Sequence, residues 1–302
     1  MTRRLAALDI GSNSTRLLVA DADGERLQEV ERLLTITRLG HGVDANGRLA
    51  DDAMERVSRC VARYAKRASE LGSETPLAVA TSAVRDAANG RDFLARLERE
   101  HGVRTRLLRG EDEARLTLRG VASGRSLDGP VVVCDIGGGS TELIAGTGDD
   151  VRFAVSLDMG CVRLSERHLH DDPPTGEQVG AVREEVTQLI PGDVPAGDLI
   201  GVAGTITTLA TIDLGLDDEV PELVDGHVLE RSTVEAELER LAALPLDRRR
   251  EVRGLMPERA PTIVAGAAIL AQLMEELGAE QLSVSERDIL HGAALLAGDA
   301  DS

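Results

Sequence analysis

Aromatic residues are almost absent from this chain of 302 residues, which has two phenylalanines, one tyrosine and no tryptophan. Its hydrophobic cores must therefore be built from aliphatic side chains, mainly Leu, Val, Ile and Ala. Proteins that bind single-stranded nucleic acid commonly stack the bases on aromatic rings. The composition therefore argues against such a platform, and we expect no nucleic-acid partner.

Lysine is nearly missing as well. Lys66 is the only one, and Lys plus Arg total 34 against 53 Asp plus Glu, a net charge of −19. A chain this acidic repels polyanions as a whole. An anionic substrate would have to be held locally, by backbone N–H groups, helix N-termini, a metal ion or a few arginines. Adaptation to high salt and GC-rich coding would each produce the shortage of lysine, and the sequence does not separate them.

Paired cysteines and long apolar runs are also lacking. The three cysteines, Cys60, Cys134 and Cys161, are odd in number and form no C-x-x-C motif, which is typical of buried thiols in a reducing compartment. The apolar stretch 262–274 is shorter than the ~20 residues that span a bilayer. The N-terminus enters a strand pattern without the apolar region of a signal peptide. We expect a cytoplasmic protein with no membrane partner.

What the sequence does contain is an internal repeat. "LAALDIGSNSTRLLVAD" (5–21) is followed 126 residues later by "VVVCDIGGGSTELIAGT" (131–147). Asp9–Val19 and Asp135–Ala145 agree at six of eleven positions. A repeat of this length is too long for a solenoid. It predicts two related domains.

The two halves share an order of elements. Each half opens with three expected strands and then alternates helix and strand, which predicts a mainly parallel sheet covered by helices. We expect duplicated α/β domains, 1–124 and 125–302, facing each other across a central cleft, with the C-terminal helix 286–298 a candidate to pack back on the first domain. The expected opening strands are 5–10, 15–20 and 26–38 in the first half and 131–136, 141–146 and 151–157 in the second.

The repeated turn has a physical use. Glycines allow a tight turn and bring backbone N–H groups close to a ligand. Consecutive N–H groups form a concavity that binds phosphate oxygens, and Ser or Thr hydroxyls add donors. The aspartate that ends each strand can hold a divalent cation beside the phosphate. Two such loops would grip a phosphate chain; the alternative, a plain hairpin turn capped by Asp, is weaker for two related copies than for one.

Five motifs carry a resemblance to a known family. Asp9–Ser14 and Asp135–Glu142 resemble the two phosphate motifs of the Ppx/GppA phosphatases, and "ATSAVRDAAN" (80–89), "GEDEAR" (110–115) and "GVAGTITTLA" (201–210) match in order. The resemblance covers essentially the whole chain. It implies the actin-like fold of sugar kinases and Hsp70, related to ribonuclease H, in the short two-domain form that lacks the extra HD-type domain of long members.

The resemblance also implies a catalytic residue. Glu113 matches the second acid of the family's G-x-E-E-A-R motif, and Asp112 stands where the first Glu usually lies. The family role is a general base that activates the attacking water. The alternative is an acid of the first helical turn that favours the helix dipole by ~0.3–1 kcal/mol.

Metal and phosphate ligands follow from the same match. Asp135 and Glu142 are the expected metal-facing acids, with Asp9 as their counterpart, for Mg²⁺ or Mn²⁺. Arg16 replaces Glu142 in the first copy, which suggests that the two loops divide the work. The expected phosphate-binding residues are Ser12, Asn13, Ser14, Arg85, Gly137, Gly138, Gly139, Ser140, Gly204 and Thr205.

Several segments have more than one interpretation. Arg85 could be an ordinary surface arginine, and the loop 39–49 could be a mobile lid or a strand connection. "HLHDD" (168–172) is not expected to bind metal, because the other histidines are scattered. The apolar face of 261–277 is either core or a contact of a homodimer.

The expected function is Mg²⁺-dependent removal of terminal phosphates from inorganic polyphosphate. The first alternative is hydrolysis of the 5′ triphosphate of guanosine pentaphosphate (pppGpp), which presents the same terminal phosphate. An actin-like kinase and a non-catalytic sensor of polyphosphate or nucleotides are further alternatives.

Overall fold

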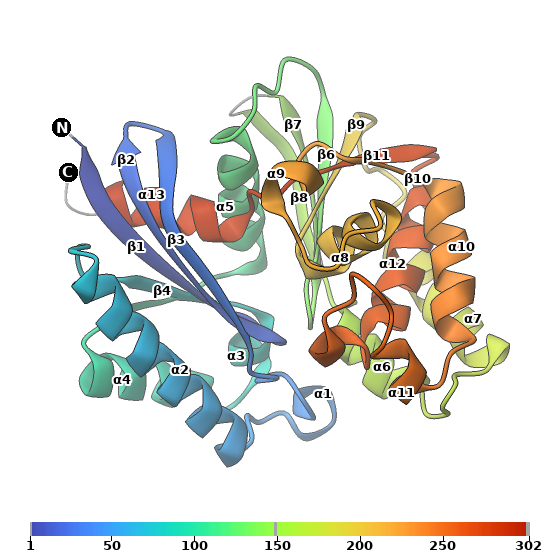
Figure 1. The fold of residues 1–302 in the computed structure, drawn as a ribbon, viewed down its shortest axis with the longest axis horizontal. Coiled ribbons are helices and arrows are strands. Elements are labelled where there is room, and N and C mark those ends of the chain that lie inside the picture. Colours follow the sequence, from blue (N-terminus) through green and yellow to red (C-terminus); the bar gives the residue numbers. More distant parts are fainter. Residues whose placement is uncertain (1, 148–149, 300–302) are drawn as a thin grey trace. The chain divides into compact units, whose positions relative to one another are not determined.

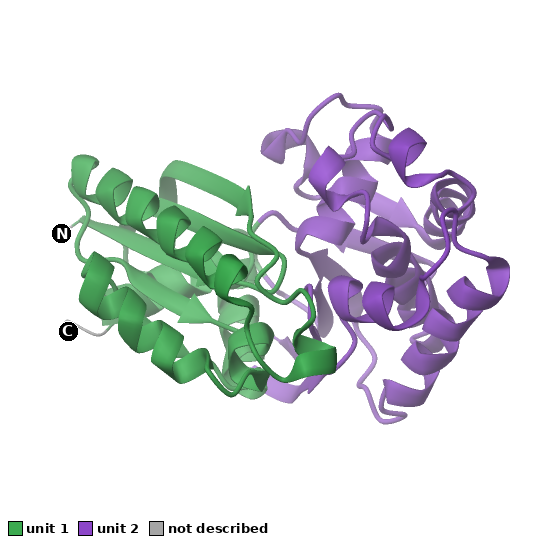
Figure 2. Cartoon of the chain, turned by 90° about the horizontal axis from the view of Figure 1, so that it is seen from below, with its two compact units in different colours: residues 1–126, 287–302 green, residues 127–286 purple. Residues whose placement is uncertain are grey.

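The computed structural model describes residues 2–147 and 150–299, and the chain divides into two compact units (Figure 2). Unit 1 comprises Met1–Ser126 and Arg287–Ser302, and unit 2 comprises Leu127–Glu286. The expected division at 124/125 lies two residues before the observed one. The segment after Glu286 belongs to unit 1 and not to the second unit, because the helix α13 (Ile289–Asp299) packs there. Unit 2 is therefore an insertion within unit 1.

Unit 1 is built on a mixed sheet of five strands in the order β3-β2-β1-β4-β5 (Figure 1). The pairs β1–β2 and β2–β3 are antiparallel, whereas β1–β4 and β4–β5 are parallel. The prediction of a mainly parallel sheet is therefore wrong, because the opening hairpins supply as many antiparallel pairs as parallel ones. The strands are β1 (Arg3–Ile10), β2 (Ser14–Asp23), β3 (Arg26–Ile36), β4 (Leu77–Ala80) and β5 (Arg104–Leu107).

Helices cover both faces of this sheet. Side chains alternate along a strand, so Ala6, Leu8 and Ile10 of β1 face α2 (Asp51–Glu70) and α4 (Gly90–His101). Leu5 and Ala7 face α5 (Gly110–Ala122) and α13. Burial on both sides explains why the middle of β1, residues 5–8, is continuously apolar. Two short helices, α1 (Val43–Asn46) and α3 (Ser82–Asp86), complete the unit.

Unit 2 repeats this topology. Its sheet has the order β10-β11-β9-β6-β7-β8, with β6–β7 and β7–β8 antiparallel and β6–β9 and β9–β11 parallel. Read from the other edge, β8-β7-β6-β9-β11 matches β3-β2-β1-β4-β5 strand for strand, which confirms the duplicated actin-like α/β fold. The strands are β6 (Val131–Ile136), β7 (Thr141–Thr147), β8 (Asp150–Leu157), β9 (Asp198–Val202), β10 (Val228–Glu230) and β11 (Gln281–Val284).

The core of unit 2 is aliphatic, as the composition predicts. The apolar run noted in the sequence is α12 (Ile263–Glu276), whose residues from Ile263 to Met274 are all buried. It is therefore core and offers no exposed apolar face for a dimer. No helix in the described part of the chain is long and apolar enough to cross a membrane. The other helices are α6 (Cys161–His168), α7 (Gly176–Leu189), α8 (Gly204–Asp213), α9 (Pro221–Val224), α10 (Arg231–Ala242), α11 (Leu246–Arg249) and the 3₁₀ turn η1 (Pro257–Arg259).

Candidate active site

The repeated sequence folds into the same turn in both units. The N–H of Gly11 donates to the carbonyl of Ser14 at 2.9 Å, and the N–H of Gly137 donates to the carbonyl of Ser140 at 3.0 Å. Each bond closes the hairpin that joins the first two strands of its unit. The sequence repeat is therefore also a structural repeat, with the turns in equivalent places.

The segment after the third strand ties down the carbonyl groups of the first turn. The N–H groups of Thr37 and Arg38 donate to Asn13 O at 3.0 and 2.8 Å, and that of Gly40 donates to Ser12 O at 2.7 Å. Within residues 2–147 and 150–299, the N–H groups of Ser12 and Asn13 have no acceptor. The turn thus has its carbonyls occupied and its N–H donors available to an anion.

The second turn is held in the same way by the start of α6. The N–H groups of Cys161 and Val162 donate to the carbonyls of Gly137 and Gly138 at 2.9 and 2.8 Å. Gly160 makes this approach possible, because a Cβ atom there would lie 2.4 Å from backbone atoms of Gly138 and Gly139. The N–H groups of Gly138 and Gly139 have no acceptor in the part of the chain that the structure describes.

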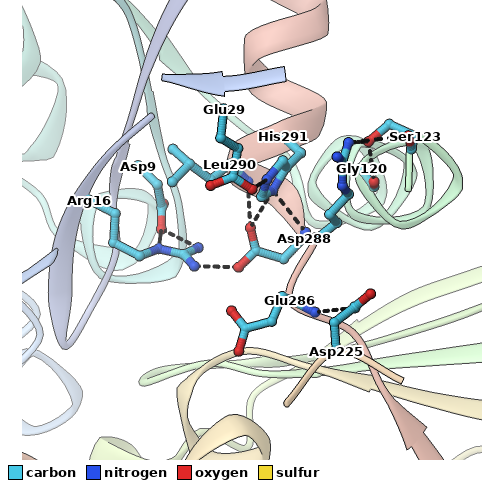
Figure 3. A network of polar contacts seen from close by, with 11 residues as sticks. Asp9, Arg16, Glu29, Gly120, Ser123, Asp225, Glu286, Asp288, Leu290 and His291 are labelled. Carbon is cyan, nitrogen blue, oxygen red and sulfur yellow. Dashed lines mark hydrogen bonds and ion pairs between the residues drawn. The ribbon is translucent and has the colours of Figure 1, made fainter. Parts of the chain in front are cut away.

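The aspartates that precede the turns have opposite partners in the two units. In unit 1, Asp9 stands across the hairpin from Arg16, which donates from Nε and Nη2 to Asp9 Oδ2 at 3.0 and 2.8 Å. Arg16 also pairs with Asp288 (Figure 3). Asp9 Oδ1 is buried and has no hydrogen-bond partner among the described residues.

Burial and Arg16 act against each other on these acids. Burial raises the pKa of Asp9 more than the nearby Arg16 lowers it. Burial would raise the pKa of Asp288 too, but Arg16 and His291 outweigh it and hold that pKa well below its usual range. His291 is fully buried and lies 3.0 Å from Glu29 through Nε2 (Figure 3). At this position of unit 1, the protein itself supplies a cation.

In unit 2 two acids face each other instead. Asp135 pairs with Glu142 across the β6–β7 hairpin, and both are buried, at 6 % and 1 % exposure. Ser156 stands opposite Glu142 on β8 and donates its Oγ–H to Glu142 Oε1 at 2.6 Å. Burial and the neighbouring Asp135 raise the pKa of the Cys134 thiol to about 12. Facing like charges repel, so this pair suits a bound cation.

A metal would need other ligands beside this pair. No group of three or more His, Cys, Asp or Glu side chains suited to a metal occurs in residues 2–147 or 150–299. Mg²⁺ is commonly held by one or two carboxylates, with waters and substrate phosphates completing its coordination. Asp135 and Glu142 fit that mode. His168 of the 168–172 segment pairs with Glu185.

Glu113 lies in the first turn of α5 beside Arg85. Arg85 Nη1 donates to Glu113 Oε2 at 3.0 Å and lies 3.4 Å from Leu108 O. Glu113 is only 6 % exposed, whereas Glu111 is exposed and Asp112 half-buried. Glu113 is therefore the buried acid in the first turn of α5. Arg85 forms an ion pair with it.

Sheet topology explains why these residues meet. The strands β1, β4 and β5 are parallel, and ligands of open α/β sheets bind beyond the carboxyl ends of such strands. Ser12 follows β1 and shares a 2.9 Å hydroxyl contact with Ser82, which follows β4 at the start of α3. Arg85 lies on the same short helix and reaches Glu113 after β5.

The corresponding edge of unit 2 carries the start of α8. Gly204 and Thr205 follow β9, which runs parallel to β6 and so ends at the same edge as the 137–140 turn. Ala203, between β9 and α8, has φ 72°, a conformation that costs free energy for a residue with a Cβ. The helix start favours an anion there.

Sequence reasoning missed several members of this arrangement. Ser82, Ser156, Arg163, Arg259 and Asp288 contact predicted site residues or their loops but belong to no predicted role. Ser82 had a signal in the sequence, because it lies within the matched segment 80–89, and so did Ser156, which lies on the expected strand next to that of Glu142. Asn89 supports the loop 39–49: Leu49 N–H donates to its Oδ1 at 2.9 Å, and its Nδ2 donates to Leu49 O at 3.0 Å. That loop is anchored at both ends.

Comparison with known proteins identifies the family. The model of the Ppx/GppA phosphatase family matches residues 18–296. Exopolyphosphatase 2 of Mycobacterium tuberculosis is 37 % identical over 97 % of this chain and 98 % of its own length. The crystal structure of the Aquifex aeolicus Ppx/GppA family member is 32 % identical with a TM-score of 0.84, covering 100 % and 99 % of the two chains. A structure of an exopolyphosphatase-like protein, also 32 % identical, has a TM-score of 0.93 and covers 99 % and 98 %. The chain therefore belongs to the Ppx/GppA phosphatase family and is an enzyme of the phosphoanhydride hydrolase class.

Proposed function

We propose that this enzyme removes terminal phosphates from inorganic polyphosphate. The observation that carries the proposal is the buried Glu113 carboxylate held by Arg85 at 3.0 Å, at the edge where the parallel strands of unit 1 end. The name of a relative that matches nearly the whole chain, Exopolyphosphatase 2, supports the choice of polyphosphate. The scarcity of aromatic rings supports it as well, because a guanine base would favour one.

Glu113 acts as the general base in this proposal. Its carboxylate accepts the proton of the water that attacks the terminal phosphorus, in line with the departing phosphate oxygen. Arg85 orients the carboxylate through its hydrogen bond to Oε2. A positioned base of this kind contributes typically ~10²–10⁴-fold to a rate.

Backbone donors hold the phosphates. The N–H groups of the two turns, at Ser12 and Asn13 and at Gly138 and Gly139, together with the start of α8, provide fixed dipoles for an anion. This mode of binding suits a protein whose net charge of −19 opposes polyanions. Fixed donors also stabilise charge that develops in the transition state.

Asp135 and Glu142 are the proposed ligands of Mg²⁺, or of Mn²⁺. When bound, the ion neutralises the pair and polarises phosphate oxygens. Asp9 remains a proposed counterpart through Oδ1, although Arg16 already neutralises part of its charge. In unit 1, Arg16 is thus the cation beside Asp9. In unit 2, Glu142 takes the equivalent position beside Asp135, and a bound metal ion would be the cation.

Phosphate release from short polyphosphate, long polyphosphate and pppGpp, measured side by side with Mg²⁺ and with a chelator, tests the proposal. We expect release from both polyphosphates, dependent on the metal and lost in Glu113→Gln. Faster release from pppGpp would favour the alternative substrate. Transfer from ATP to an acceptor in excess of hydrolysis would indicate a kinase, and binding without release would indicate a sensor.

A further inference from the structure

Two peptide groups of unit 2 share an unusual environment. In a trans peptide the C=O and N–H bonds point in opposite directions. The peptides Gly139–Ser140 and Gly204–Thr205 each have an arginine side chain on the carbonyl oxygen, that of Arg163 and that of Arg259. The N–H groups on their other sides, those of Ser140 and Thr205, have no acceptor in residues 2–147 and 150–299. Each arginine therefore lies on the opposite side of the peptide from an available donor.

Arg163 serves the first peptide. It lies in the first turn of α6, its Nε donates to Gly139 O at 2.7 Å, and its side chain is only 12 % exposed. Its Nη2 lies 3.9 Å from Asp158 Oδ1. The backbone N–H of Arg163 also donates to Gly138 O at 3.1 Å. Both the main chain and the side chain of this residue thus fix the glycine turn.

Arg259 serves the second peptide. Its Nη1 donates to Gly204 O and, at 2.9 Å, to the Oγ1 of Thr208 one turn along α8. A Cβ atom at Gly204 would lie 2.2 Å from that Nη1, so a larger residue there would displace the guanidinium from this position. The peptide follows Ala203, whose φ of 72° is itself strained. The bond to Arg259 helps to hold this start of the helix in place.

Both carbonyl contacts lie beside the start of a helix. Arg163 is in the first turn of α6, and Arg259, which ends the 3₁₀ turn η1, reaches the first residue of α8. A helix N-terminus carries positive partial charge and favours an anion. The two arginines therefore fix peptide groups at places that favour a phosphate.

We propose that Arg163 and Arg259 are positioning residues, which aim the N–H groups of Ser140 and Thr205 at a phosphate of the substrate. A donor on the carbonyl polarises the same peptide and strengthens its N–H as a donor. The arginines therefore act on the anion through one peptide group each. This inference rests on the proposed function, since Ser140 and Thr205 are expected phosphate-binding residues of the same site and the two arginines are the residues that hold their peptide groups.

The test compares Arg163→Gln and Arg163→Lys with Arg167→Gln, a matched control one turn further along α6 whose arginine pairs with Glu185. For Arg163→Gln we expect KM for polyphosphate to rise about tenfold with kcat changed much less, as for loss of one hydrogen bond in binding. In ¹⁵N-labelled protein without ligand, the amide proton of Ser140 should move upfield, and its response to inorganic phosphate should weaken. Arg163→Lys, which keeps the charge but not the planar fork, should be intermediate, and Arg167→Gln should match wild type.

Arg259→Gln should change the amide of Thr205 in the same manner and leave that of Ser140 in place. A Ser140 amide and a KM that both stay at wild-type values in a folded Arg163→Gln would overturn the inference, as would equal changes in Arg167→Gln. Should Arg163→Gln not fold, Arg163→Lys carries the same comparison. If wild type releases phosphate from neither polyphosphate nor pppGpp, the proposed function fails. The amide response to inorganic phosphate still tests the two arginines in that case.

Discussion

Asp9 and Arg16 face each other across the first hairpin and are joined by bonds of 3.0 and 2.8 Å, while the same two positions of the second hairpin hold Asp135 and Glu142. One substitution between the copies thus turns an ion pair into a pair of like charges. The repeat preserved the backbone turn and changed its electrostatics.

Arg16→Gln should strongly destabilise unit 1. The change leaves the buried carboxylates of Asp9 and Asp288 without their shared cation, a loss of ~3–5 kcal/mol for a buried pair. Urea unfolding measures it. Arg4→Gln is the matched control, because Arg4 pairs with Asp21 across the same hairpin but is more exposed. Solvent screens that pair, so a much smaller loss is expected; equal losses would contradict the role given to Arg16.

The contribution of Asp288 to stability should depend on pH. Its pKa is lowered in the folded protein, by Arg16 and His291 against the effect of burial. The stability it contributes is therefore present above 3.8, the ordinary pKa of the group, and is lost as pH falls below it. Unfolding of wild type and Asp288→Asn should differ most at neutral pH, and the difference should shrink in acid. A difference that stays constant down to pH 3 would refute this.

Glu113→Gln should lower kcat by about 10²–10⁴-fold and leave folding intact. The amide can still accept the hydrogen bond from Arg85, so the geometry is kept while the base is lost. Glu111→Gln provides the control, because that acid is in the same helical turn but exposed. Steady-state rates and thermal unfolding of both variants check the prediction. Near-normal turnover in Glu113→Gln would remove it from the mechanism.

Glu142→Gln should raise the Mg²⁺ concentration needed for half-maximal activity, because one of two proposed ligands is lost. In a chelator, the same variant should unfold at a higher temperature than wild type, since repulsion from Asp135 is relieved. Ser156→Ala removes only the 2.6 Å hydrogen bond to Glu142, so its Mg²⁺ requirement should rise less. Unchanged metal dependence in Glu142→Gln would place the ion elsewhere.

Gly160→Ala should impair phosphate binding. The added Cβ would lie 2.4 Å from backbone atoms of Gly138 and Gly139, so the turn must shift. Gly180→Ala on α7 is the control, since nothing lies within 4 Å of its Cβ position, and a helix gains ~0.5–1 kcal/mol from the change. Titration with inorganic phosphate separates the two: weaker binding in Gly160→Ala alone is expected.

Local patterns predicted much of this fold. The strand Val131–Ile136 was expected with those bounds, and the repeat located both turns. Pairing between distant strands was harder to foresee: β10 has only three residues and forms through its partner β11. The sequence also predicted too many parallel strand pairs. Polar turns separate the strands whether they are joined by a short hairpin or by a helical crossover, so the turns alone do not show the strand direction.

In the candidate site, too, residues of contiguous motifs were predicted, whereas contacts between residues distant in the sequence were not. Glu113 and the glycine turns were found because each belongs to a contiguous motif. Asp288 meets Arg16 across 272 residues of sequence, and Arg163 reaches Gly139 across 24. No spacing rule connects such pairs, since their contact depends on how helices close over a sheet.

The insertion of unit 2 within unit 1 has a consequence for biosynthesis. A ribosome delivers the first strands early, yet one face of their sheet awaits α13, whose Ile289, Leu290 and Ala293 lie against Leu5 and Ala7. The inserted unit is complete before that helix emerges. The unit whose strands are translated first is thus the last to be completed. A nonsense codon just beyond Glu286 would leave the inserted unit whole and would remove α13 from unit 1.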